Sequence, residues 1–304
     1  MYAGNPLLAP QGSIARGGAA VRALAHIRRL YGDRARPMPS SAQTGEMPMT
    51  EPLLLSTTRI TTYDGDRVLT GATGFFFERE DQLFLVTSRH VFIDAASKHH
   101  PNRIEIELHT DEVDLRAMQV LSLFTYHEGF SLWRQASDGG GEIDVAVLPL
   151  PRESFPAGTV LRCFTPAHVQ HTQPDVEVGQ PLLVVGFPLG FHDTLHHLPV
   201  VRQASVASAF GVRFQGQGFF LTDARTHRGA SGAPVVMRDA ALGATLPWRL
   251  LGVHASRMDM GTRDLVLDES LGLNCAWYAD ILLTLTAPPA AAAATGASGA
   301  ITQT

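Results

Sequence analysis

Short apolar segments separated by polar turns make up most of the chain between residues 50 and 287. The segments Gly74–Glu78 and Leu83–Thr87 flank a polar turn at 79–82, a pattern typical of a β-hairpin. Residues 104–109 alternate between apolar and polar side chains, as expected of a half-buried strand. Further strands are expected at 118–124, 145–150, 181–190, 200–210, 218–224, 233–236 and 249–255. This spacing predicts an all-β sandwich or barrels, with one short helix at Tyr278–Leu285.

The composition is that of a soluble globular protein with a sizeable core, since 45% of the 304 residues are hydrophobic and 17% are charged. The net charge of −5 gives no indication of a nucleic-acid partner. No apolar run is long enough to span a membrane, and the N-terminus lacks the apolar stretch of a secretory signal, so we expect a cytoplasmic protein. Cys163 and Cys275 are interpreted as buried free thiols, with a single disulfide as the alternative.

The two ends of the chain differ from its middle. Residues 1–50 carry six arginines and one acidic residue before Glu46, and they read as a basic extension that is disordered or partly helical. A disordered extension is the favoured interpretation. The alternative is a short amphipathic helix that contacts a membrane surface or a partner. Residues 288–304 are rich in alanine, glycine and threonine, and a disordered tail is expected there.

The strongest single motif for chemistry is RGASGAP at 228–234. A glycine two residues before Ser231 lets the backbone turn so that the N–H groups of Gly229 and Ser231 can point into one cavity, where they would stabilise an oxyanion. Gly232 leaves room beside the hydroxyl of Ser231. Because Gly–X–Ser–Gly also occurs in ordinary turns, this motif alone does not establish a catalytic serine.

Two further motifs supply candidate partners for this serine. In FLVTSRHVF at 84–92, an apolar strand ends just before His90, which a turn can present in a cleft. In EIDVAVLPL at 142–150, Asp144 heads an apolar run, and a buried carboxylate is costly unless a group such as a histidine N–H binds it. Taken singly, His90 could be a surface or core histidine and Asp144 a strand cap. The order His, Asp, Ser is that of chymotrypsin, and separations of 54 and 87 residues leave room for two barrels.

Together these motifs resemble the trypsin-like peptidases of the chymotrypsin clan, and within it the bacterial HtrA-type proteases and glutamyl endopeptidases. The segments that carry the resemblance are, in chain order, GATGFFF, LVTSRHV, DVAVLPL, VGFPLG, TDARTHRGASGAPV and LLGVHAS. The resemblance covers about residues 55–286. It implies a peptidase domain at 51–287 with two antiparallel six-stranded β-barrels that meet near 150–175, followed by the short helix.

The resemblance also implies roles for individual residues. His90 would be the general base, Asp144 its orienting carboxylate, and Ser231 the nucleophile that attacks a protein or peptide substrate. The backbone N–H groups of Gly229 and Ser231 would form the oxyanion hole. The alternative to a serine endopeptidase is a catalytically silent protease fold used as a binding module, which would not need this full set of residues.

A preference for an acidic residue before the cleaved bond is a further implication. Thr226 and His254 stand where glutamyl endopeptidases bind the substrate carboxylate with a hydroxyl and a histidine. Independently of the family, both side chains can donate hydrogen bonds to a carboxylate, and Arg225 would add favourable charge. The alternative is that His254 is only a strand residue and that Arg257 partly fills the pocket.

No cofactor or metal is expected from the sequence. Histidines gather at His99–His100 and at His192, His196 and His197, but neither group has a known ligand spacing such as His-Glu-x-x-His. We therefore interpret them as loop histidines.

Overall fold

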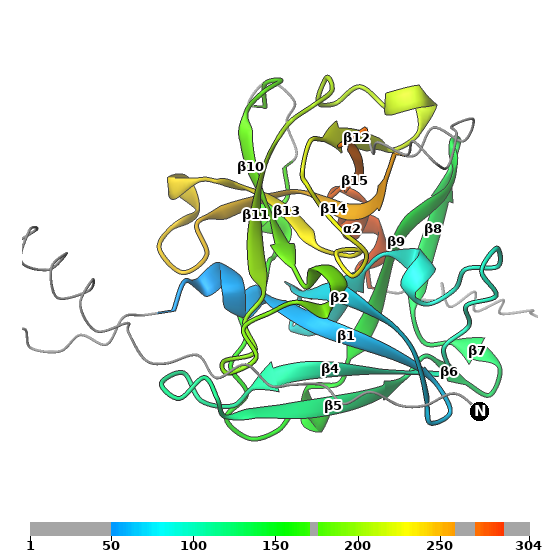
Figure 1. Ribbon diagram of the computed structural model, residues 1–304, viewed down its shortest axis with the longest axis vertical. Coiled ribbons are helices and arrows are strands. Elements are labelled where there is room, and N and C mark those ends of the chain that lie inside the picture. Colours follow the sequence, from blue (N-terminus) through cyan, green and yellow to red (C-terminus); the bar gives the residue numbers. More distant parts are fainter. Residues whose placement is uncertain (1–49, 171–175, 259–270, 289–304) are drawn as a thin grey trace, which may run out of the picture. The chain divides into compact units, whose positions relative to one another are not determined.

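The protein is described by a computed structural model that covers residues 50–170, 176–258 and 271–288, all within one compact unit that begins at Thr50. The predicted N-terminal extension and C-terminal tail lie outside the described residues, apart from Thr50 and Pro288. Antiparallel strands dominate the described part and form two large sheets (Figure 1). The all-β fold class predicted from the sequence is confirmed, and the two sheets have the barrel-like form of the chymotrypsin fold.

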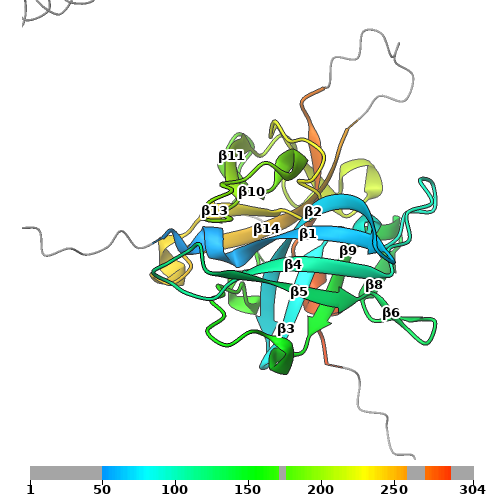
Figure 2. The same ribbon diagram turned by 60° about the horizontal axis from the view of Figure 1, so that its bottom comes forward.

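The first sheet contains seven strands in the order β5-β4-β1-β2-β3-β9-β8. Figure 2 shows three of them, β5, β4 and β1, side by side. Their bounds are β1 Thr57–Asp64, β2 Arg67–Arg79, β3 Gln82–Thr87, β4 Arg103–His109, β5 Met118–Phe124, β8 Arg134–Asp138 and β9 Gly141–Leu150. This sheet has one strand more than the six that were expected. Its last strand in this order, β8, pairs with β9 across a turn at Gly139–Gly140. A separate two-stranded ribbon is formed by β6 (Tyr126–His127) and β7 (Phe130–Ser131).

The second sheet contains six strands in the order β11-β10-β13-β14-β15-β12. Their bounds are β10 Pro181–Gly186, β11 Val200–Ser205, β12 Phe219–Thr222, β13 Pro234–Arg238, β14 Trp248–Arg257 and β15 Asn274–Tyr278. An antiparallel bridge between Val206 and Thr222 joins the two outermost strands, and the N–H of Ala207 donates to the carbonyl of Leu221 at 2.8 Å. These contacts close the second sheet into a barrel.

The predicted hairpin is formed by β2 and β3. Its two turn residues, Glu80 and Asp81, have φ values of +51° and +62°, so both adopt the left-handed conformation that matches the twist of a two-residue hairpin. Aspartate is one of the residues that adopt this conformation more readily than most, and neither turn residue is β-branched. The hairpin pairs β3 with β2, and the chain continues from the far end of β3 to His90.

The continuous apolar run of β3 is explained by burial on both of its faces. Leu83 and Leu85 point into the core of the first barrel, whereas Phe84 and Val86 point into a second core that both barrels share. Successive side chains of a strand point to opposite faces, so a strand between two cores needs apolar residues at every position.

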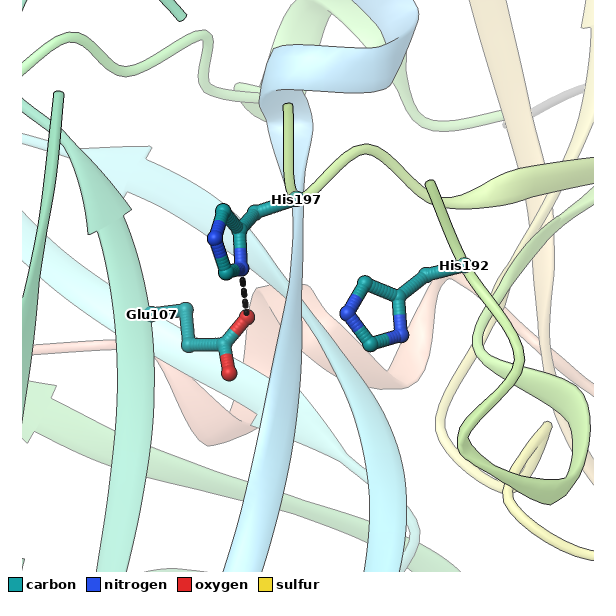
Figure 3. Close-up of side chains that lie close together, drawn as sticks. All are labelled: Glu107, His192 and His197. Carbon is teal, nitrogen blue, oxygen red and sulfur yellow. Dashed lines mark ion pairs between the residues drawn. The ribbon is translucent and has the colours of Figure 1, made fainter. Parts of the chain in front are cut away.

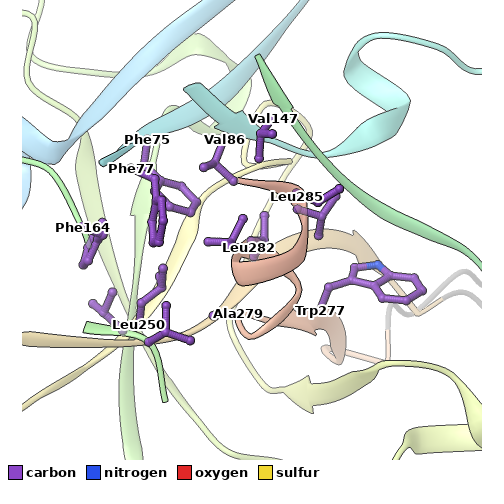
Figure 4. Close-up of a cluster of buried hydrophobic side chains, with 14 of the residues drawn as sticks. Phe75, Phe77, Val86, Val147, Phe164, Leu250, Trp277, Ala279, Leu282 and Leu285 are labelled. Atoms are coloured by element: carbon purple, nitrogen blue, oxygen red, sulfur yellow. The ribbon is translucent and has the colours of Figure 1, made fainter. Parts of the chain in front are cut away.

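The shared core lies between the two sheets (Figure 4). Phe75 from the first sheet and Leu250 and Trp277 from the second contribute to it, and so do Leu282 and Leu285 from the helix near the C-terminal end of the described residues. The shared core therefore fixes the first barrel against the second.

That helix, α2, covers Ile281–Leu285 and is shorter than the predicted Tyr278–Leu285. Tyr278 instead ends β15, where its ring packs against Phe210 and Phe220 of the second barrel. Arg79 of the first sheet donates to the carbonyl of Leu283 at 2.7 Å and so holds α2 in place. The remaining helical turns are short 3₁₀ segments: η1 Pro52–Ser56, η2 Arg89–Val91, η3 Arg152–Ser154, η4 Pro166–His168, η5 Pro188–Gly190, η6 Phe214–Gly216 and η7 Ala240–Leu242.

The two cysteines are free thiols, as the favoured interpretation of the sequence had it. Burial raises the pKa of Cys163 to about 12 and that of Cys275 to about 11, so both thiols are protonated at neutral pH. None of the helices within the described ranges has the length and apolar character that a membrane span requires.

Candidate active site

His90 and Asp144 lie side by side on the first barrel. His90 belongs to the 3₁₀ turn that follows β3, and Asp144 lies near the start of β9, the strand paired with β3. The Nδ1 atom of His90 is 2.8 Å from Oδ2 of Asp144, and the backbone N–H of His90 donates to Oδ1 at 2.9 Å. Both carboxylate oxygens thus contact the same residue. The contact at Nδ1 orients the ring, and the other ring nitrogen, Nε2, points away from Asp144.

Asp144 is less buried than the sequence indicates, since 27% of its side chain is exposed, against 37% for His90. The reason is its place in β9: it precedes the residues that pair with β3 and faces an irregularity in β8. Burial alone would lower the pKa of His90. The hydrogen bond to Asp144 and the charges of Asp144 and Asp94 outweigh that effect and raise the pKa above its ordinary value of 6.5.

Ser231 lies on the second barrel, in the turn that leads into β13. Its hydroxyl donates to the carbonyl of Ala255 on β14 at 3.0 Å. Within the described ranges, Nε2 of His90 has no hydrogen-bond partner, so the hydroxyl of Ser231 and the imidazole are not yet bonded to one another. Contacts of this kind are often loose without substrate and tighten when it binds.

The turn before Ser231 has a conformation that only glycine adopts easily. Gly229 has a φ of +91°, and a Cβ atom there would lie 2.5 Å from the carbonyl oxygen of Phe187. The carbonyl of Arg228 accepts the N–H of Leu189 at 2.5 Å, so the N–H of Gly229, in the same peptide unit, points the opposite way. Among the described residues neither this N–H nor that of Ser231 has an acceptor. Two free donors beside the serine are what an oxyanion hole requires.

Thr73, a residue that the motif analysis did not single out, connects this turn to the first barrel. Its N–H donates to the carbonyl of Ser231 at 2.9 Å, and its hydroxyl donates to the carbonyl of Gly229 at 2.7 Å. Ser88, two residues before His90, donates to the carbonyl of His254 at 3.2 Å. Both side chains are fully buried, and each hydroxyl donates to a carbonyl of the other barrel. The order of the motifs did not mark either residue. They hold the two halves of the site in register.

The sequence matches the trypsin-like peptidase domain over residues 72–243, more than half of the chain. The chain belongs to the trypsin-like peptidase family. The matched region contains His90, Asp144 and Ser231, and the family predicted from the sequence is confirmed.

Solved structures similar to this peptidase include a serine endoprotease from Yersinia pestis, with 15% identity and a TM-score of 0.45 over 79% of this chain and 66% of that one. The HtrA-type protease AlgW with a tripeptide also has 15% identity and a TM-score of 0.45, over 76% of this chain and 58% of that one. The peptidase thus spans less than two thirds of the length of either chain. A search of curated proteins returned no match.

The three residues predicted to contact the substrate have different surroundings. His254 on β14 is buried, with 2% of its surface exposed, and its Nδ1 atom has no hydrogen-bond partner among the described residues. Burial, together with the positive charge of His90, lowers its pKa to about 4. The hydroxyl of buried Thr226 donates to Oδ1 of Asn274 at 2.7 Å, so its hydrogen is used within the fold. Arg225 is exposed.

Proposed function

We propose that this trypsin-like peptidase is a serine endopeptidase in which His90, Asp144 and Ser231 act as a catalytic triad. Nε2 of His90 accepts the hydroxyl proton as Oγ of Ser231 attacks a peptide carbonyl. The N–H groups of Gly229 and Ser231 bind the oxyanion of the tetrahedral intermediate. Protonated His90 then gives the proton to the departing amine. Water, activated by His90, hydrolyses the acyl-enzyme and restores Ser231.

One observation carries this proposal: a single carboxylate, that of Asp144, contacts both Nδ1 of the His90 ring and the backbone N–H of His90. A carboxylate at Nδ1 selects the tautomer whose Nε2 lone pair can accept a proton, and it stabilises the imidazolium that forms. The free N–H groups beside Ser231 supply the second requirement. A protein that only bound peptides would need neither arrangement.

Labelling with a fluorophosphonate tests the proposal directly. Oγ of Ser231 is expected to attack phosphorus, expel fluoride and pass its proton to His90, which leaves a stable phosphonyl ester on the serine. Mass spectrometry of peptides from the labelled full chain should find the adduct at Ser231. The Ser231→Ala variant should remain unlabelled, and His90→Ala should react far more slowly. Absence of an adduct on folded wild-type protein would favour the silent binding module.

The same site supports a preference for an acidic residue before the cleaved bond. His254 is a neutral, buried imidazole with an unpartnered nitrogen, and its backbone is bonded to the residues next to Ser231 through Gly232 and Ala233. A substrate carboxylate beside it would accept the imidazole N–H and would raise the pKa of His254 from about 4. We assign the contact to His254, with Arg225 adding charge from outside. Thr226 can take part only if its hydroxyl turns away from Asn274.

Replacement of His254 by alanine is expected to lower the ratio of kcat/KM for a Glu peptide to that for the matched Gln peptide by about 10-fold to 100-fold, the usual effect of a hydrogen bond to a charged group. Because carboxylate binding favours protonated His254, the wild-type ratio should rise as the pH falls from 8 to 6. The titration of His90 affects both substrates equally and cancels in the ratio.

Arg225→Gln, with the fold intact, serves as the comparison and should lower the ratio less. Best cleavage after Arg or Phe, or a ratio that His254→Ala leaves unchanged, would exclude this role.

A further inference from the structure

Three potential metal ligands from separate parts of the chain meet outside the candidate active site. They are Glu107 on β4 and two histidines, His192 and His197, of the loop between β10 and β11 (Figure 3). One ligand atom from each lies within 4.8 Å of the other two. Nδ1 of His197 is 3.4 Å from Oε2 of Glu107. The sequence shows only the histidines, because Glu107 is 85 residues away from His192 in the chain.

The loop is seated on β4 by contacts that do not involve these three side chains. Nε2 of His109 is 2.7 Å from the carbonyl oxygen of His196. His109 and Glu107 are two residues apart on one strand and therefore point to the same face. Within the loop, an antiparallel bridge between Asp193 and Leu198 brings the residues that flank it, His192 and His197, next to one another.

Each of the three side chains offers one atom whose lone pair is available to a metal ion. Oε1 of Glu107 accepts Nε of Arg59 at 2.9 Å, which orients the carboxylate and leaves Oε2 free. Oε2 of Glu107 and Nδ1 of His197 are both buried and have no hydrogen-bond partner among the described residues. Nδ1 of His192 is 2.6 Å from the carbonyl of Gly190, so it carries the proton and its Nε2 keeps a lone pair. Buried polar atoms without hydrogen-bond partners are uncommon. Here two such atoms lie close to a third atom with a free lone pair, Nε2 of His192.

We propose that Glu107, His192 and His197 bind a zinc ion. Two imidazoles and one carboxylate are a donor set that zinc takes, whereas magnesium and calcium prefer oxygen ligands alone. Two ligands at zinc's usual bond lengths and the tetrahedral angle lie about 3.4 Å apart. The separation of Nδ1 of His197 from Oε2 of Glu107 has this value. A modest inward turn of the His192 ring completes the three-ligand site, with water as the fourth ligand.

The metal would connect the first barrel to the loop that supports the oxyanion turn. His192 contacts the carbonyl of Gly190, and the neighbouring N–H of Leu189 holds the carbonyl of Arg228, which orients the N–H of Gly229. Zinc at Glu107 would therefore fix this loop from its far side. None of the three ligands belongs to the proposed catalytic triad, so the role inferred for the ion is to stabilise this loop.

Zinc binding to the full chain, with no other divalent metal present, is measured by isothermal titration calorimetry, and thermal unfolding is followed with and without zinc. Wild type is expected to bind one equivalent and to unfold at a higher temperature with zinc than without it. His192→Gln and His197→Gln should each weaken binding by more than about 100-fold, because each removes a ligand. Cobalt(II) should give the visible absorption bands of a four- or five-coordinate ion in wild type, and these bands should be absent from both ligand variants.

His196→Gln is the matched control, since His196 lies in the same loop but bonds Asp193 through its Nδ1 atom. It should retain zinc affinity. Glu107→Gln also removes the ion pair with Arg59, so it is used only if its circular dichroism matches wild type. Absence of zinc binding by wild type would overturn the site. So would binding that survives both ligand substitutions, or that is lost equally in His196→Gln.

Discussion

Replacement of Ser231 by alanine is expected to lower kcat for peptide hydrolysis by on the order of 10⁶-fold, the loss seen when a triad nucleophile is removed. The substitution deletes Oγ and its hydrogen bond to the carbonyl of Ala255, and it leaves the backbone N–H groups of Gly229 and Ser231 in place. The variant should therefore still bind substrate. Steady-state kinetics with an unstructured protein substrate, together with peptide affinity, measure both effects.

Ser154→Ala is the control for that experiment. Ser154 is an exposed serine in η3 whose hydroxyl bonds only the nearby carbonyl of Pro151, so its removal should leave kcat unchanged. Thermal unfolding of the Ser231 variant should stay close to that of wild type, because Ser231 is only partly buried. If peptidase activity were the same in Ser231→Ala as in wild type, the nucleophile would have to be another residue.

Replacement of Asp144 by asparagine should lower kcat by about 10⁴-fold at neutral pH. The carboxylate accepts both the ring N–H and the backbone N–H of His90, and an amide that presents its NH₂ group to the ring favours the wrong tautomer. Asp144 also raises the pKa of His90, which must be neutral to act as the base. In wild type, kcat/KM should thus fall below an apparent pKa higher than 6.5. In the variant this fall should move to lower pH, because burial then dominates.

The Asp94→Asn variant separates the effect of a nearby negative charge on the pKa of His90 from the effect of the hydrogen bonds between Asp144 and His90. Asp94 raises the pKa of His90 by its charge without bonding it, since its carboxylate bonds Ala96 and Ser97. In this variant the fall in kcat/KM on the acid side should move to slightly lower pH, and kcat should stay within a few-fold of wild type. A kcat in Asp144→Asn within ten-fold of wild type would show that His90 does not depend on this carboxylate.

Strands that follow local pattern rules could be predicted from the sequence. The hairpin of β2 and β3 was predicted because apolar runs flank a short polar turn, and β5 was predicted at its observed bounds, Met118–Phe124. Tyr278 was assigned to the wrong element because the apolar residues of β15 run directly into those of α2. A short apolar run fits a buried strand and a buried helix equally well, and only the partner strand decides between them.

The candidate site was predictable as far as it rests on motifs. His90 and Asp144 meet because β3 pairs with β9. The motifs predicted that these two residues are partners, but not the strand pairing that brings them together. Thr73 and Glu107 gave no such signal, because their partners, the turn at Gly229 and the histidine loop, lie far away in the chain. Contacts of that kind follow from how the two barrels pack, which no local pattern records. The exposure of Asp144 likewise depends on an irregularity in a neighbouring strand.

The late position of α2 in the sequence has a consequence for folding during synthesis. Leu282 and Leu285 belong to the core that joins the barrels, yet they are synthesised after every described strand of both. A nascent chain that has not reached residue 285 carries His90 and Ser231 on two halves whose common core is incomplete. Since domains generally fold as units, we expect the two barrels to reach their final packing only after residue 285 has been synthesised.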